Sequence, residues 1–216
     1  MTANFPVTEE WLDGTGGRIF TRHWEPEVSP KANLVICHGV NSHGGQYVQA
    51  GEEFASRGFA VTALDLRGRG KSDGERFYID SIDDYVADVS VTIEHARAKH
   101  PELPVYLLGH SAGGVTSTTY ALDHQDRIDG LICESFAFRV FAPNLALKLL
   151  EGASHIVPHA HVLRLRMEAA MALKRPASCP SSSWESAAMR VFRSPAATRS
   201  TPTARRRRGR AMARPR

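Results

Sequence analysis

Four short apolar runs, separated by helix-compatible stretches, constrain the fold more than any other feature of this sequence. They cover residues 33–39, 59–65, 104–109 and 128–134. Runs of this length and β-rich composition are typical of strands that are buried on both faces of a parallel sheet. The alternation of strand and helix with short connections therefore predicts an α/β fold, with a mostly parallel sheet and helices on both faces.

Two further segments add detail to this prediction. Apolar residues recur at helical spacing over residues 81–100, and Ser81 is placed to cap this helix, with Asp83 and Asp84 in its first turn. Residues 11–26 have turn residues between two strand-like pieces. This pattern predicts an antiparallel hairpin at the edge of the sheet.

The third apolar run leads into the pentapeptide Gly109-His110-Ser111-Ala112-Gly113, which is followed by a helix-compatible stretch. A G-x-S-x-G sequence between strand and helix is typical of a sharp turn that lifts the serine hydroxyl clear of the sheet. The flanking glycines are needed because the backbones pass too closely for side chains. We therefore predict that Ser111 is a nucleophile.

His38 and Gly39 end the first apolar run, and the loop that follows them is the second component of the predicted site. In acyl transfer, such a loop donates one backbone N–H to the developing oxyanion, and the residue after the nucleophile donates the other. By position, the two donors are Val40 and Ala112. We interpret the His38 side chain as a turn-capping group.

Four segments, in this order and spacing, resemble the monoacylglycerol lipase and lysophospholipase branch of the α/β-hydrolase family, a serine aminopeptidase S33-type domain. They are "HGVNSHGGQY", "ASRGFAVTALDLRGRGKSDG", "YIDSIDDYVADV" and "LPVYLLGHSAGG", and the likeness covers roughly residues 8–165. The resemblance implies a serine hydrolase of carboxylic esters that acts on single-chain acylglycerols or related lipids without a cofactor. Arg69 stands where this family usually has histidine, in a turn that we expect to be structural.

The resemblance also implies a catalytic acid and a histidine downstream of the serine, and we find neither. Asp129 is the last aspartate, and we expect Asp123, Asp126 and Asp129 at the wrong end of the sheet. Glu134 ends a strand, but this strand is one too early to carry the family's catalytic acid. His110 should point away from Ser111. His155, His159 and His161 fall where the family's cap begins, and they do not have the spacing of a metal site. We therefore expect this chain to hydrolyse esters hardly at all.

Gly70-Lys71-Ser72 imitates part of a phosphate-binding loop. That motif needs glycine five positions before Gly70, where this chain has Asp65. The segment also does not lead directly from a strand into a helix. We therefore do not predict a nucleotide site here.

The composition changes beyond residue 166. Residues 162–216 hold 14 of the 27 Lys and Arg residues but only two of the 23 Asp and Glu residues, and Ala, Ser and Pro are frequent. We predict a partial α/β-hydrolase domain over residues 1–166, with a cap beginning near 136, and a disordered basic tail over residues 167–216. On this prediction the chain lacks the last strands and most of the cap of the family's fold. We hypothesise that a shifted reading frame near residues 166–167 is the cause.

The alternative to an ester hydrolase is an inactive remnant with an adventitious basic tail. Arginines 205–208 and Arg210 could contact phosphates of nucleic acid or anionic lipid, but no aromatic residue interleaves with them. We therefore expect no specific nucleic-acid partner and no more than peripheral membrane contact.

The three cysteines have no paired spacing, and no apolar run approaches ~20 residues, so we expect a cytoplasmic protein without metal or cofactor.

Overall fold

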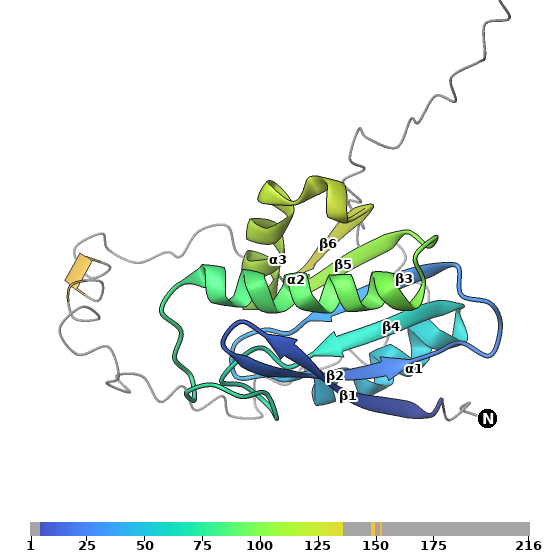
Figure 1. Ribbon diagram of the computed structural model, residues 1–216, viewed down its shortest axis with the longest axis horizontal. Coiled ribbons are helices and arrows are strands. Elements are labelled where there is room, and N and C mark those ends of the chain that lie inside the picture. Colours follow the sequence, from blue (N-terminus) through green and yellow to red (C-terminus); the bar gives the residue numbers. More distant parts are fainter. Residues whose placement is uncertain (1–4, 136–147, 150–151, 153–216) are drawn as a thin grey trace, which may run out of the picture.

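The computed structural model describes residues 5–135, 148, 149 and 152 (Figure 1). Six strands form one sheet in the order β1-β2-β4-β3-β5-β6. They are β1 (Val7–Gly14), β2 (Gly17–Trp24), β3 (Ala32–Cys37), β4 (Phe59–Leu64), β5 (Val105–His110) and β6 (Gly130–Glu134). The α-helices are α1 (Val48–Ser56), α2 (Ile82–Lys99) and α3 (Ala112–Asp123), and short 3₁₀ turns lie at η1 (Gly44–Tyr47) and η2 (Gln125–Arg127).

The pairing of the strands confirms the predicted α/β architecture. β4, β3, β5 and β6 pair with one another in parallel, and these are the four apolar runs of the sequence. β1 and β2 form the predicted antiparallel hairpin at the edge, and β2 continues antiparallel to β4. The hairpin begins earlier than expected, at Val7, and β6 begins later, at Gly130.

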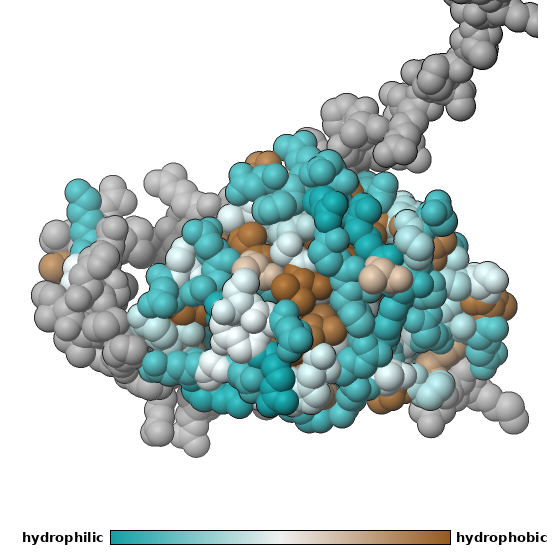
Figure 2. Space-filling view, viewed as in Figure 1, coloured by the Kyte–Doolittle hydropathy of each residue, from teal (hydrophilic) through white to brown (hydrophobic). Residues whose placement is uncertain are grey.

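Helices cover both faces of the sheet, which explains why the parallel strands are apolar at most positions. In β3, Val35 and Cys37 pack with residues of α2 and α3 on one face. Leu34 and Ile36 pack with Ala55 of α1 on the other face. The outer surface that bears α2 is mostly hydrophilic, with apolar residues in small patches (Figure 2). The core is therefore two apolar layers separated by the sheet.

The N-terminus of α2 is capped as predicted. The Ser81 hydroxyl accepts a hydrogen bond from the Asp83 backbone N–H, and the Asp84 carboxylate accepts one from the Ser81 N–H. Both groups satisfy backbone donors that the first helical turn leaves without partners. This capping box sets the start of α2, which packs beside the loop that follows β4.

No helix within the described residues is both long and apolar enough to cross a bilayer. The predicted cap from residue 136 and the predicted tail over residues 167–216 lie outside the described residues, apart from three positions between 148 and 152.

Candidate active site

Ser111 lies on the turn between β5 and α3. Its backbone angles are φ 54° and ψ −119°, a combination that residues with a side chain rarely adopt. Its N–H donates to the Glu134 carbonyl oxygen at 2.9 Å, and its own carbonyl accepts from the Gly114 N–H at 3.0 Å. The turn is thus held from β6 and from α3. Such strained positions cluster at functional sites.

The glycines around Ser111 are required by close backbone contacts. A Cβ atom on Gly113 would lie 2.2 Å from the Cys37 carbonyl oxygen and 2.4 Å from that of His38. A Cβ atom on Gly109 would lie 2.6 Å from the Gly113 carbonyl oxygen. Gly39 is similarly close, because a Cβ there would lie 3.0 Å from that of Ser111. The first turn of α3 therefore sits directly against the end of β3.

The buried His38 side chain links the ends of β3 and β4. Its Nε2 accepts a hydrogen bond from the Leu66 N–H at 3.1 Å, so its Nδ1 carries the proton and donates to the Gly39 carbonyl oxygen at 2.8 Å. Burial lowers the pKa of His38 to about 4. His38 is thus a neutral group that shapes the loop carrying Val40.

This burial predicts a loss of stability in mild acid. The unfolded His38 takes up a proton near pH 6.5, whereas the folded one stays neutral until about pH 4, so stability is present above pH 6.5 and lost as the pH falls towards 4. We expect this group to lower the free energy of unfolding by about 2 kcal/mol between pH 7 and pH 5.

Urea unfolding at both pH values measures this loss in the wild type, in His38→Gln and in the control His100→Gln. The control removes a partly exposed histidine on the surface. A pH dependence as steep in His38→Gln as in the wild type would contradict the assignment.

A cavity of about 150 Å³ lies where the ends of β3 and β4 meet the first turn of α3. Both predicted oxyanion donors, Val40 and Ala112, line it, together with His38, Gly39, Leu66, Arg69, Tyr85, Gly113 and Thr116. Arg69 is in the turn that we expected, but it also lines this cavity, which the sequence did not indicate.

No imidazole within the described residues is hydrogen-bonded to the Ser111 hydroxyl. His110, the neighbour of Ser111, has its Nδ1 3.0 Å from the Tyr47 hydroxyl of η1. Asp129 accepts a hydrogen bond from the Val105 N–H, at the opposite end of β5 from Ser111. Glu134 is exposed and pairs with His110 in the sheet, so it is the acidic residue that β6 places beside the turn. His155, His159 and His161 lie outside the described residues.

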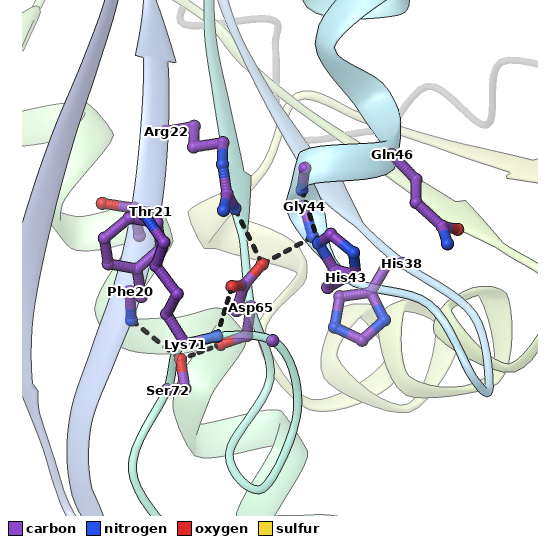
Figure 3. Close-up of polar contacts among 12 residues, drawn as sticks. Phe20, Thr21, Arg22, His38, His43, Gly44, Gln46, Asp65, Lys71 and Ser72 are labelled. Carbon is purple, nitrogen blue, oxygen red and sulfur yellow. Dashed lines mark hydrogen bonds and ion pairs between the residues drawn. The ribbon is translucent and has the colours of Figure 1, made fainter.

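The segment that imitates a phosphate loop is held by the buried Asp65 (Figure 3). One carboxylate oxygen accepts from the Arg22 guanidinium at 3.0 Å and from the Gly44 N–H at 2.6 Å, and the other accepts from the Lys71 N–H at 2.8 Å. The Ser72 hydroxyl donates to the Asp65 carbonyl. The groups that would bind a phosphate are therefore engaged within the fold.

Glu10, His23 and His95 form a cluster that was not predicted from the sequence, with donor atoms within 4.8 Å of one another. The Lys99 ammonium lies 2.7 Å from one Glu10 oxygen, and His95 Nε2 lies 2.9 Å from the other. Both ring nitrogens of His23 lie 2.9 Å from threonine hydroxyls. These contacts give the cluster a structural role, in which Lys99 already supplies a cation for Glu10.

Comparison with known proteins agrees with this geometry. Residues 28–210 match the family model of serine aminopeptidase S33. The chain is 34% identical over 148 residues to a monoglyceride lipase homolog of Monkeypox virus, which covers 68% of this chain and 54% of that protein. It is 37% identical over 108 residues to a monoacylglycerol lipase of Mycolicibacterium smegmatis, covering 50% and 39% of the two chains. The chain thus spans about half, or less, of the length of these relatives.

The fold is also similar to that of solved structures. A thermostable carboxyl esterase of Bacillus coagulans superposes with a TM-score of 0.61 at 22% identity, over 70% of this chain and 50% of that one. A serine hydrolase of Xanthomonas campestris superposes with a TM-score of 0.51 at 23% identity, over 61% and 62% of the two chains. With most of the chain matched by the family model, this protein belongs to the serine aminopeptidase S33 family of α/β-hydrolases.

Proposed function

We propose that the site at Ser111 is that of a serine hydrolase of carboxylic esters, with single-chain lipids such as monoacylglycerols or lysophospholipids as substrates. The observation that carries the proposal is the left-handed backbone of Ser111 at the start of α3, beside the loop of Val40. Relatives named monoglyceride lipase and phospholipase, at 31–37% identity, support the ester class.

In the proposed mechanism, the Ser111 oxygen attacks the acyl carbonyl carbon and forms a tetrahedral intermediate. The backbone N–H groups of Val40 and Ala112 donate to the oxygen that becomes negative, and the positive end of the α3 dipole stabilises the same charge. The intermediate collapses to an acyl-serine and releases the alcohol. Water then hydrolyses the acyl-serine and frees the acid. A histidine must take the serine proton and pass it to the leaving alkoxide.

We place the protein in the cytoplasm, with no more than peripheral contact to membranes. Free thiols at Cys37 and Cys133 support a reducing compartment. Cys37 is buried, and burial raises its thiol pKa to about 12, so this thiol is unreactive.

A second proposal is that the 216-residue chain binds esters but does not turn them over. It is favoured by the surroundings of Ser111, where residues 5–135 provide no imidazole within hydrogen-bond distance of the hydroxyl. It is also favoured by the sequence, in which no aspartate follows Asp129. On this proposal the chain is an inactive remnant with a basic tail over residues 167–216.

The nucleophile is tested in a chimera that joins residues 1–135 to the corresponding C-terminal segment of the Mycolicibacterium smegmatis relative. We expect the chimera to hydrolyse p-nitrophenyl butyrate, Ser111→Ala to abolish this activity, and Ser56→Ala to retain it. Ser56 is the matched control because its hydroxyl donates to the Glu53 carbonyl on the exposed side of α1. A Ser111→Ala chimera that keeps its activity would refute the role of Ser111.

A further inference from the structure

We propose that Arg69 binds a phosphate group on the substrate, so that the site selects single-chain acyl esters that carry a phosphate over neutral monoacylglycerols. This inference rests on the proposed function and narrows its substrate class.

The first observation is the position of Arg69. It lies in the turn after β4, where its N–H donates to the Leu66 carbonyl and its carbonyl accepts from the Ser72 N–H. Arg69 lines the cavity that Val40 and Ala112 also line. Its guanidinium contacts the hydroxyl of Tyr85, another lining residue, so its charge lies beside the two proposed oxyanion donors.

The second observation is that this guanidinium is held in place but lacks a counterion. Its Nε donates to the Tyr85 hydroxyl at 3.2 Å, and its central carbon lies 4.4 Å from the centre of the Phe77 ring. Nη1 is buried and has no hydrogen-bond partner among the described residues. No carboxylate among the described residues neutralises this charge, so an anion that enters the cavity is attracted to it.

The basic residues two positions before and after Arg69 differ from it, because each has a carboxylate partner. Arg67 pairs with Asp88 at 2.7 Å, and Lys71 pairs with Glu9 at 2.9 Å. Within residues 5–135, no carboxylate forms such a pair with Arg69. The cavity thus has a fixed positive charge beside the N-terminus of α3, whose dipole also favours an anion.

Phosphate fits these groups better than a neutral hydroxyl does. A guanidinium presents parallel N–H donors that match two phosphate oxygens. Tyr85 accepts from Arg69 and keeps its own O–H as a further donor at the cavity. The cavity volume of about 150 Å³ exceeds what a single water needs. In a lysophosphatidate, the phosphate lies a few bonds from the ester and within reach of one site.

The test measures binding by the full 216-residue chain, so that it does not depend on turnover. The two ligands are octanoyl lysophosphatidate and octanoylglycerol, which differ by the phosphate alone, and calorimetry at constant ionic strength gives their affinities. We expect the phosphate ligand to bind about tenfold more tightly. Arg69→Gln should abolish this preference, and Arg69→Lys should retain part of it. Arg57→Gln, which removes an exposed arginine just after α1, should retain all of it.

Each other outcome overturns the inference. Equal binding of the two ligands, binding of neither, or a preference that survives in Arg69→Gln would show that Arg69 does not bind the phosphate. Inorganic phosphate that binds as tightly as the lysophosphatidate would show a site for the free ion. Thermal melting of each variant checks that it folds.

Experiments can distinguish failure of the proposed function from failure of this inference. Ser111→Ala should keep the tenfold preference, because it removes only the nucleophilic hydroxyl. An active chimera with no preference for phosphate would refute the inference alone. A preference for phosphate with no dependence of hydrolysis on Ser111 would refute the proposed nucleophile alone.

Discussion

Ester turnover by the 216-residue chain is expected to be about 10⁶-fold slower than that of a serine hydrolase with a complete triad. In subtilisin, removing the serine or the histidine alone lowers kcat about as much as removing the whole triad, by roughly 10⁶-fold. Residues 5–135 offer the Ser111 hydroxyl no general base, so at neutral pH it stays protonated and the leaving alkoxide receives no proton. The Val40 and Ala112 N–H groups could still provide ~10³–10⁴-fold over water.

The measurement compares p-nitrophenyl butyrate turnover by the wild-type chain with that by Ser111→Ala, and we expect the two rates to be similar. Ordinary esterase rates that Ser111→Ala abolishes would contradict the prediction. A histidine outside the described residues would then be the base, and His155→Ala and His159→Ala would identify which.

The sheet could be predicted from the sequence because its strands are buried in two layers. Every residue of β3 is buried, so the run from Ala32 to Cys37 is apolar at all but one position, which is a strong local signal. The exception, Asn33, donates its side-chain amide to the His100 carbonyl. The Ser81 cap was predictable because it is also a local signal: a capping box is encoded within four consecutive residues.

The buried carboxylates could not be predicted, because their partners lie far away in the sequence. Asp65 pairs with Arg22, 43 positions earlier, and Asp88 pairs with Arg67, 21 positions earlier. Periodicity places an aspartate on a helix or at a strand end, but it does not show which distant cation the fold brings to it. From the sequence alone, the acidic residues of α2 would be expected to face solvent, whereas Asp88 is buried.

The candidate site was predictable in part. The turn of Ser111 follows from a local motif, and the structure places it between β5 and α3 as expected. The role of Ser111 remains a prediction. The cavity needed the three-dimensional fold, since it joins the loop after β3, the turn after β4, α2 and α3. The sequence therefore indicated Arg69 as a turn residue but not as a cavity residue.

Asp88→Ala is expected to lower the free energy of unfolding by about 3–5 kcal/mol, because it leaves the charge of the buried Arg67 without its main partner. One Asp88 oxygen accepts from Arg67 Nε at 3.0 Å and from Nη2 at 2.7 Å, and the other accepts from the Arg67 backbone N–H at 2.8 Å. Asp88 is fully buried, so water does not replace these bonds. Asp84 contacts Nη1 and is more exposed, and it therefore compensates only partly.

Urea unfolding measures the effect, and Glu53→Ala is the matched control. Glu53 pairs with Arg57 on the exposed side of α1, where such a pair contributes about 0.3–0.5 kcal/mol. A loss below about 1 kcal/mol in Asp88→Ala would show that the turn after β4 does not depend on this ion pair. The same turn carries Leu66 and Arg69 to the cavity, so a large loss would show that α2 stabilises the turn that holds Arg69.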